Sequence, residues 1–339
     1  MITYNHENFI EEAINGVLMQ ECDFEIELIL ANDCSPDKTE KIIRDIITSH
    51  PKGSLIKYFR HKENIGMQPN VYFAVEQCKG KYIAMCEGDD YWTDPLKLQK
   101  QIDFLELNSS FVACFHKVSI LEENGSIVED YITNVPSNYQ TIEDIASKGN
   151  YIHTPSVVFR NIIKEFPPEM TLSPLGDYFL YMLLAEHGNF KYIEENMAVY
   201  RNGVGVFSSQ TQNSKIINTQ VAFFLIWKYF QSKNEKIAQI IFNRLQLFDN
   251  KIEAVAQELY KQLNQYLLDE KVFSSFHKSS RIKTEDFNQN DIKSAINVFL
   301  KKTNVKFLIK LILFKLGFVK LRDSIIKKRK KIQVLENIF

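Results

Sequence analysis

Residues 82–92 read Tyr-Ile-Ala-Met-Cys-Glu-Gly-Asp-Asp-Tyr-Trp, a short apolar run that ends in three acids. Runs of this length are typical of a strand buried on both faces of a sheet. The carboxylates of Glu87, Asp89 and Asp90 would be costly to bury at the end of such a strand without a cation. Ligands of open α/β sheets bind beyond the carboxyl ends of the strands, so this stretch predicts a hard divalent cation and an anionic substrate. An ordinary acidic turn is the alternative.

Helix-like and strand-like segments alternate around this stretch over residues 1–120. Strands are expected at 24–31, 54–60 and 81–86, and helices at 7–20, 37–48, 70–77 and 94–107. Such βαβ alternation predicts a mixed, mainly parallel α/β sheet with right-handed crossovers, flanked by helices. Further along, the sequence predicts a hairpin around Asn124-Gly125, a helix capped by Thr141, strands at 154–160 and 190–200, and a helix at 173–187. From about residue 213 the pattern is helical.

The composition is that of an ordinary globular protein, with 45% hydrophobic and 24% charged residues. Five cysteines without a C-x-x-C pair favour reduced thiols in a cytoplasmic protein. The sequence has neither a signal-peptide pattern nor the roughly 18 uncharged apolar residues of a membrane span. Residues 1–4 resemble the end of a strand that is usually about five or six residues long, which suggests a late translation start.

Asp33 follows the strand expected at 24–31, in the sequence Asn32-Asp33-Cys-Ser35-Pro-Asp37. If the strands are parallel, Asp33 and the three acids lie at the same edge of the sheet. A ligand role is therefore expected for Asp33. The alternative is that Asp33, Ser35 and Asp37 form an Asx turn and cap the next helix, which we favour for Asp37.

Two more stretches are candidates. Asn64-Ile65-Gly66 follows the 54–60 strand and either presents amide groups to a ribose or phosphate or forms a plain turn. Asp177 lies in the first turn of the helix expected from about Pro174, where the helix dipole favours an acid with or without a catalytic role. Zinc-site spacings, G-x-S-x-G, the P-loop and G-x-G-x-x-G are absent, so those chemistries receive little support.

These stretches together resemble glycosyltransferase family 2, whose members have the GT-A fold. The resemblance spans roughly residues 1–205. It rests on Thr3-Tyr4-Asn5, the loop at 32–39, Asn64-x-Gly66, residues 82–90 followed by Tyr-Trp-x-x-Pro-x-Lys-Leu-x-x-Gln, and Gly176-Asp177.

The resemblance implies an inverting transfer from a nucleotide-sugar donor, for which a UDP-sugar is favoured, with Mg²⁺ or Mn²⁺ as cofactor. Asp177 would be the catalytic base and Asp89 the metal ligand. The expected donor-binding residues are Thr3, Tyr4, Asn5, Asp33, Asn64, Gly66, Glu87, Gly88 and Arg201. Among them, Asp33 would contact the base and Glu87 would lie near the ribose.

The chain departs from the family pattern at two motif positions. Glu87 replaces the usual Asp, and Gly203 stands two residues after the Tyr200-Arg201 pair, where members often have His. The donor diphosphate would then depend on Arg201, on the loop at 203–208 or on the metal.

Residues 301–331 carry twelve Lys or Arg and one Asp, a charge of +11, which leaves −12 on the rest of the chain. Apolar residues between the lysines permit a helix lying in an anionic membrane surface, and the alternative is a helix packed on the body. Nucleic-acid binding is not expected, because the basic run at 327–331 has no interleaved aromatic residue and the tail matches no recognised nucleic-acid-binding module. The predicted organisation is a catalytic domain at 1–210, a helical region at 211–300 and a basic tail at 301–339.

The function predicted is sugar transfer to a hydroxyl of a glycan or lipid-linked glycan in bacterial-type surface polysaccharide synthesis. The enzyme would be cytoplasmic or peripheral on the inner membrane face, and the sugar a hexose or N-acetylhexosamine. A sugar nucleotidyltransferase is an alternative, although residues 3–7 lack its Gly-rich loop. A second alternative is a non-catalytic module that binds a nucleotide-sugar or a membrane.

Overall fold

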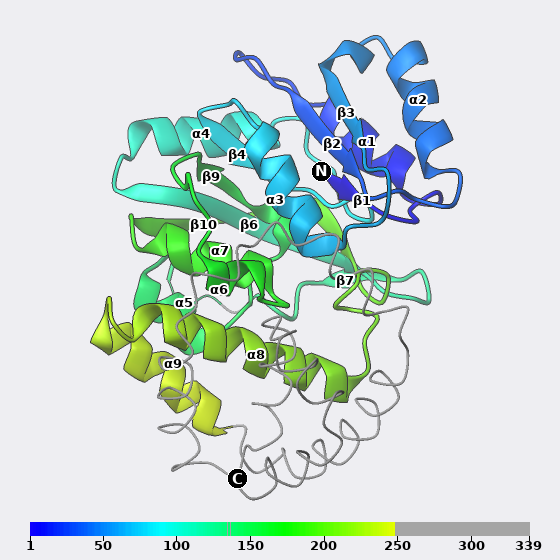
Figure 1. Ribbon diagram of the computed structural model, residues 1–339. Helices are drawn as coiled ribbons and strands as arrows, with labels where there is room; N and C mark the ends of the chain where they lie inside the picture. Colours follow the sequence, from blue (N-terminus) through cyan, green and yellow to red (C-terminus); the bar gives the residue numbers. More distant parts are fainter. Residues whose placement is uncertain (134, 136, 248–339) are drawn as a thin grey trace, which may run out of the picture. The chain divides into compact units, whose positions relative to one another are not determined.

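The computed structural model describes residues 1–133, 135 and 137–247 (Figure 1). The chain divides into two compact units. The first comprises Met1–Pro167 and Leu175–Lys215, and the second comprises, among the described residues, Pro168–Pro174 and 216–247. All candidate site residues belong to the first unit. The basic tail at 301–339 lies outside the described residues.

A three-stranded parallel sheet forms the N-terminal part of the first unit, in the order β1-β2-β3. Its strands are β1 (Ile2–Thr3), β2 (Leu28–Asn32) and β3 (Ile56–Arg60). The helices between and after them are α1 (Ile10–Leu18), α2 (Thr39–Ser49) and α3 (Met67–Gln77). The parallel βαβ arrangement expected here is therefore confirmed.

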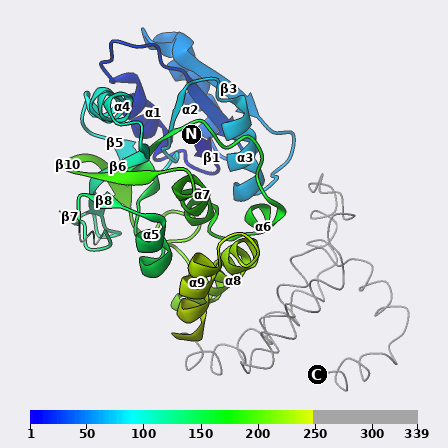
Figure 2. The same ribbon diagram turned by 90° about the vertical axis from the view of Figure 1, so that its left-hand side faces the viewer.

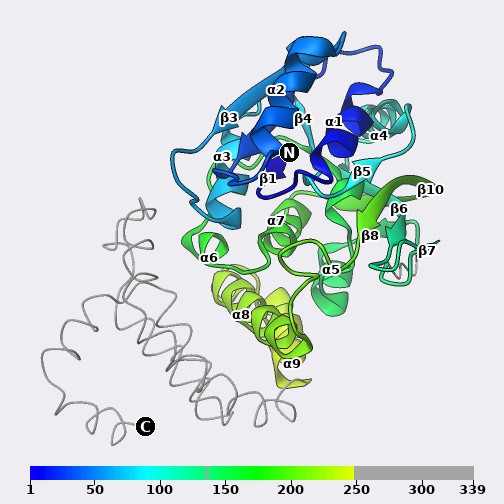
Figure 3. The same ribbon diagram turned by 90° about the vertical axis from the view of Figure 1, so that its right-hand side faces the viewer.

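The central strand β2 is buried along its whole length because helices cover both of its faces. Leu28 and Leu30 belong to a core cluster that includes residues of α1 and α2. Ile29 and Ala31 point to the other face, where they pack with Ala74 of α3. Figures 2 and 3 show α1 and α3 on opposite sides of β1. Burial on two faces explains why the β2 sequence is continuously apolar instead of alternating.

A larger mixed sheet follows, with the strand order β4-β9-β6-β10-β5, while β7 pairs with β6 and β8 with β10. The strands are β4 (Tyr82–Ala84), β5 (Tyr91–Trp92), β6 (Phe111–Leu121), β7 (Ile127–Glu129), β8 (Tyr139–Gln140), β9 (Val158–Arg160) and β10 (Asn189–Arg201). Within this sheet β6 and β10 are parallel, and the other pairings are antiparallel. The mixed α/β architecture is confirmed, with its parallel pairing in β1–β2–β3 and β6–β10.

The two sheets meet at β1. The amide of Gly88, beyond β4, donates to the carbonyl of Ile2 at 2.9 Å. On the other side of β1 the amide of Asp33 donates to the carbonyl of Thr3, also at 2.9 Å. The acids that follow β2 and β4 therefore lie beside the end of β1, as the sequence predicted.

Three further helices complete the first unit: α4 (Lys97–Leu107), α5 (Ile142–Lys148) and α7 (Gly176–Ala185). Thr141 caps α5 in a capping box with Asp144, as expected. Almost every residue of α7 is buried, which fits a core helix with apolar residues all around it. Asp177 stands in its first turn.

The sequence did not predict the two-residue strands β5 and β8, since two residues carry no periodic signal. Several boundaries also differ by a few residues. Helix α1 begins at Ile10 instead of residue 7, β2 begins at Leu28 instead of residue 24, and α7 begins at Gly176.

The described part of the second unit is helical, with α6 (Pro168–Thr171), α9 (Glu235–Leu247) and most of α8 (Gln212–Phe230). The Trp227 ring of α8 contacts Phe224 on its own helix and Phe242 on α9, with centroid distances of 5.7 and 6.1 Å. Within the described chain, the helices fall short of the length and apolar character that crossing a membrane requires.

Candidate functional site

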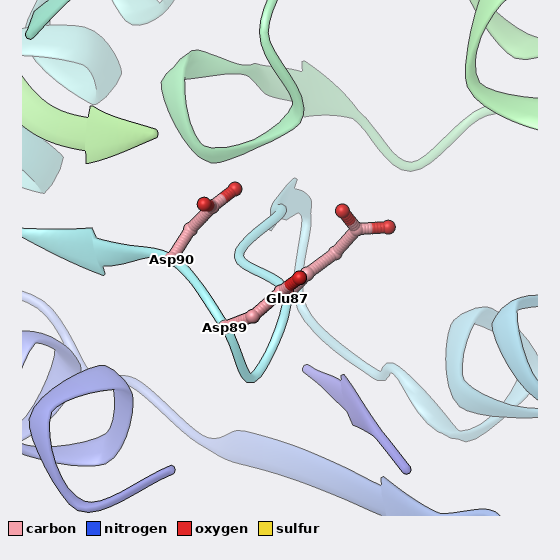
Figure 4. A group of neighbouring side chains, drawn as sticks. All are labelled: Glu87, Asp89 and Asp90. Carbon is pink, nitrogen blue, oxygen red and sulfur yellow. The ribbon is translucent and has the colours of Figure 1, made fainter. Parts of the chain in front are cut away.

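Glu87, Asp89 and Asp90 lie on one tight turn, which we call the acid turn (residues 87–90), between β4 and β5. One carboxylate oxygen from each of the three acids lies within 4.8 Å of the others. Figure 4 shows the Glu87 and Asp90 side chains rising on the same side of the chain, with Asp89 at the bend. Hard cations such as Mg²⁺ and Mn²⁺ prefer oxygen ligands, so the donor set is chemically suited to them.

The electrostatics of the acid turn favour a bound cation. Burial, reinforced by the charges of Asp89 and Asp177, raises the pKa of Glu87 to about 8. Burial and the charges of Asp89 and Glu87 raise the pKa of Asp90 well above its ordinary value. In addition, Asp90 Oδ2 is buried without a hydrogen-bond partner. A divalent cation would relieve the repulsion between these groups, so the residues present fit such an ion.

Arg201, at the end of β10, holds the acid turn in place through hydrogen bonds. Its backbone amide donates to Asp90 Oδ1 at 2.8 Å, and its guanidinium donates to the carbonyl of Asp89 and to the Glu12 carboxylate of α1. The side chain is 6% exposed and lies over the rings of Phe9 and Tyr91, at 5.0 and 4.7 Å from their centroids. The guanidinium thus contacts the backbone of the turn, and its expected contact with a donor stays a prediction.

Gly88 allows β1 and the chain after it to approach the acid turn. A Cβ at this position would lie 2.9 Å from Thr3 Oγ1 and 2.8 Å from His6 Nδ1. Both of those atoms are buried and without a hydrogen-bond partner. Any larger residue at 88 would therefore push these polar groups away from the acids. No sequence pattern pointed to His6.

The segment containing Tyr4 and Asn5 is tied to the loop after β2. Asn5 has a left-handed φ of 60°, and its amide donates to Ser35 Oγ at 3.0 Å. Ser35 Oγ in turn donates to Asn32 Oδ1 at 2.7 Å. Tyr4 is 45% exposed, so it can offer its ring to a ligand on the outside of this segment.

Asp33, Asn64 and Gly66 come together as the sequence predicted. The two Asp33 carboxylate oxygens accept from the amides of Ile65 at 2.7 Å and Gly66 at 2.8 Å. Asn64 Oδ1 also accepts from the Gly66 amide, at 3.1 Å. Gly66 has a φ of 91°, a conformation that favours glycine, and it immediately precedes α3. The Asp33 carboxylate therefore fixes the loop that leads into α3.

Asp177 supplies a fourth carboxylate, separate from the acid turn. Asn150 Nδ2 donates to Asp177 Oδ2 at 2.7 Å. Burial raises the pKa of Asp177, while hydrogen bonds from Asn150 and from backbone amides lower it in part. Because the charge of Asp177 also raises the pKa of Glu87, the base candidate and the acid turn share one electrostatic environment.

A buried Asp130–His153 pair near Asp177 was not anticipated. Asp130 Oδ1 lies 3.2 Å from His153 Nε2, and the two side chains are 2% and 5% exposed. The His153 ring also packs on Tyr200, with 4.7 Å between centroids. Burial alone would raise the pKa of Asp130, but the hydrogen bond and charge of His153 lower it. No local sequence pattern indicates this pair, which joins the residue after β7 to the segment before β9.

Comparison with known proteins identifies the domain. Residues 1–166 match the family model described as Glycosyl transferase family 2. The chain carries a family 2 glycosyltransferase domain. The match includes the acid turn, the Asp33 loop and Asn64–Gly66, whereas Asp177 and Arg201 lie beyond it.

Curated relatives of this glycosyltransferase domain include an uncharacterized protein, Rv1520, of Mycobacterium tuberculosis. It is 34% identical over 200 residues, which is 59% of this chain and 57% of the relative. The match therefore spans only a little over half of that protein. The putative teichuronic acid biosynthesis glycosyltransferase TuaG of Bacillus subtilis is 30% identical over 131 residues, which is 38% of this chain and 49% of TuaG.

Among solved structures, TarS of S. aureus in complex with UDP superposes with a TM-score of 0.55 at 17% identity. The superposition covers 76% of this chain and 73% of the TarS chain. At this identity the similarity establishes the fold, which is that of the GT-A glycosyltransferases. The predicted family and fold are therefore confirmed.

Proposed function

We propose that the protein is a metal-dependent, inverting glycosyltransferase. It transfers a hexosyl or N-acetylhexosaminyl group from a nucleotide diphosphate sugar, with a UDP-sugar favoured, to a hydroxyl of a glycan or lipid-linked glycan. The observation that carries the proposal is the pairing of the acid turn, in which Asp89 and Asp90 are buried and Glu87 is half-buried, with a separate carboxylate, Asp177, whose charge reaches Glu87. The acid turn can bind a cation that in turn binds a diphosphate, whereas Asp177 can take the proton of an acceptor hydroxyl.

The donor half of the site consists of loops at the ends of β1, β2, β3 and β4. Asp33 accepts hydrogen bonds only, so it selects a nucleobase edge that presents N–H groups. Thr3 Oγ1 has a free hydrogen-bonding capacity beside Gly88 and would meet the ribose or diphosphate together with Glu87. Tyr4, Asn5, Asn64 and Gly66 border the same edge.

Asp89 would hold the cation, with Asp90 and Glu87 completing the acidic surroundings. A bound Mg²⁺ or Mn²⁺ supplies positive charge that offsets the negative charge gathering on the leaving diphosphate. Gly205 lies beside the Asp89 carboxylate, so the loop at 203–208 borders the same place. Arg201 keeps the turn in position through the carbonyl of Asp89.

Asp177 would act as the general base. Its carboxylate accepts the proton of the acceptor hydroxyl as that oxygen bonds to the anomeric carbon, while the bond to the diphosphate oxygen breaks on the opposite face. Attack from the opposite face inverts the configuration at this carbon. A raised pKa makes Asp177 a better proton acceptor near neutral pH than an ordinary aspartate.

The relatives support a role in surface polysaccharide synthesis, because TuaG is described as a teichuronic acid biosynthesis glycosyltransferase. The acceptor would accordingly be a growing or lipid-linked glycan at the inner face of the cell membrane. We further propose that the +11 charge of residues 301–331 attracts the protein to anionic lipid there.

The proposal is tested by incubating the full chain with a panel of nucleotide sugars and Mn²⁺, with and without EDTA, and measuring nucleoside diphosphate release. Thermal shifts with each donor identify the nucleotide, and product analysis on lipid-linked acceptors identifies the linkage. EDTA-sensitive release with one donor class supports the proposal. A donor that binds without turnover in the presence of every acceptor would instead indicate a non-catalytic binding module.

A further inference from the structure

The segment 149–154, between α5 and β9, places one side chain against Asp177. Asn150 Nδ2 donates to Asp177 Oδ2 at 2.7 Å across 27 residues of sequence. Burial raises the pKa of the Asp177 carboxyl, and this hydrogen bond lowers it in part. Asn150 itself is exposed, so the contact lies on the side of Asp177 that solvent, and hence an acceptor, can reach.

The backbone around Asn150 is held firmly although its side chain is exposed. On its C-terminal side, the Tyr151 carbonyl accepts from Thr133 Oγ1 at 2.9 Å, and the Tyr151 hydroxyl donates to Gln140 Oε1 at 2.9 Å. Two residues further on, His153 is paired with buried Asp130. Tyr151 and His153 are themselves buried. These anchors fix where the Asn150 amide can reach.

The chemistry of an amide suits this place. An asparagine Nδ2–H donates to a carboxylate without carrying a charge and without titrating, so it cannot compete for the acceptor proton. A hydrogen bond to the ionised form of a carboxylate stabilises that form and restricts its rotation. A lysine or histidine at 150 would bring a positive charge that stabilises the carboxylate too strongly for a base.

We propose that Asn150 is a positioning residue for the transfer reaction, which fixes the orientation of the Asp177 carboxylate toward the acceptor hydroxyl. This inference rests on the proposed function. It assigns to the exposed end of segment 149–154 a role in turnover that is separate from donor binding.

Several other groups act on the same carboxylate, and they set the direction of the pH effect. The Glu87 charge on the acid turn opposes ionisation of Asp177, whereas His153 favours it. Tyr72 of α3 and Tyr181 of α7 face Asp177 and stay neutral, because burial and the Asp177 charge raise the pKa of each hydroxyl. Loss of the Asn150 hydrogen bond leaves the opposing influences in place, so the pKa of Asp177 should rise.

The test compares Asn150→Ala and Asn150→Asp with the wild-type chain. Asn150→Asp keeps the shape of the side chain but replaces the donor by a second carboxylate. Asn243→Ala is the matched control, because Asn243 is an exposed asparagine that accepts a side-chain hydrogen bond from Gln239 on α9. Two readouts are used: the pH profile of transfer, and the titration of Asp177 by carboxyl ¹³C NMR of aspartate-labelled protein, assigned with Asp177→Asn.

We expect Asn150→Ala to lower kcat about tenfold at neutral pH, the equivalent of one hydrogen bond to a charged group, with an unchanged KM for the donor. The acid limb of the profile and the ¹³C titration should both move to higher pH, further in Asn150→Asp, while the control stays at wild-type values. Full turnover with an unshifted titration in Asn150→Ala overturns the inference alone. Absence of transfer by the wild-type chain overturns the proposed function itself, and the titration then still shows whether Asn150 acts on Asp177.

Discussion

The acid turn and Asp177 carry the same kind of side chain but are held in opposite ways. The acid turn is fixed by partners from distant parts of the chain: the carbonyl of Ile2, the backbone and guanidinium of Arg201 and, through that guanidinium, Glu12. Asp177 stands at the start of a buried helix, and its carboxylate accepts a hydrogen bond from the exposed Asn150. The proposed donor half of the site is thus held by the folded core, whereas the proposed base contacts an exposed side chain. Substitutions in the acid turn should lower stability and donor binding, whereas substitution of Asp177 should lower turnover.

The largest effect is expected from Asp177→Asn. Because the amide cannot take the acceptor proton, transfer should fall about 10²- to 10⁴-fold, while the melting temperature should not fall. Measured turnover and thermal melts check both parts. Asp103→Asn, at an exposed residue of α4, is the control and should retain full activity. A large loss of stability in Asp177→Asn would contradict the separation of the two halves.

Asp89→Asn tests the donor half directly. Wild-type protein should be stabilised by Mn²⁺, since an ion that binds the folded state alone shifts the folding equilibrium. At a concentration of 100 times the dissociation constant this stabilisation is about 2.7 kcal/mol. Differential scanning fluorimetry with and without Mn²⁺ should show the shift in wild type and in Asp177→Asn, but a much smaller one in Asp89→Asn. Equal shifts in all three proteins would place the ion elsewhere.

Arg201→Gln should lower the free energy of unfolding by about 1–3 kcal/mol, because it leaves the carbonyl of Asp89 without its donor. Urea unfolding monitored by circular dichroism measures this loss. The matched control is Arg44→Gln, since Arg44 makes an exposed pair with Glu40 on α2 and its loss should change stability by about 0.5 kcal/mol or less. If the two variants were equally stable, Arg201 would not brace the acid turn.

A further prediction concerns Lys97, which is fully buried beside the strand that leaves the acid turn. Its Nζ lies 4.1 Å from the centroid of the Trp92 ring and donates to Gln101 Oε1 at 2.8 Å. Burial lowers the pKa of Lys97 from 10.5 to about 7. Between these two values the unfolded chain binds more protons at this residue than the folded chain does, so the contribution of Lys97 to stability increases as the pH rises.

Lys97→Met removes this titration. The stability of wild type relative to Lys97→Met should therefore increase between pH 7 and pH 9.5, as measured by urea unfolding at both values. Lys41→Met, at an exposed lysine of α2, should show no such pH-dependent difference. A difference for Lys97→Met that stays constant over this range would contradict the lowered pKa.

The sequence predicted those parts of the fold that show an apolar run or periodicity, or a polar residue that marks the end of an element. Apolar runs and the residues that end them predicted the buried strand β2 and the acids after β4. They also predicted the helix α7 with Asp177 in its first turn. The joint position of Asp33 and the acid turn followed from the geometry of parallel strands.

The remaining parts depend on contacts between residues far apart in the chain. Asn150 contacts Asp177 across 27 positions and His153 contacts Asp130 across 23, and no local pattern distinguishes these residues from other polar ones. Arg201 illustrates a different difficulty. Its position beside the site was expected, but the partners of its guanidinium depend on where α1 places Glu12.

The most direct test of the account compares donor binding with turnover in the same three proteins. Isothermal titration of the nucleotide sugar with Mn²⁺ into wild type, Asp89→Asn and Asp177→Asn should give wild-type affinity for Asp177→Asn and weakened affinity for Asp89→Asn, while both variants lose transfer. Near-normal turnover by Asp177→Asn, or equal loss of donor affinity in both variants, would contradict the assignment of the acid turn to the donor and of Asp177 to the acceptor.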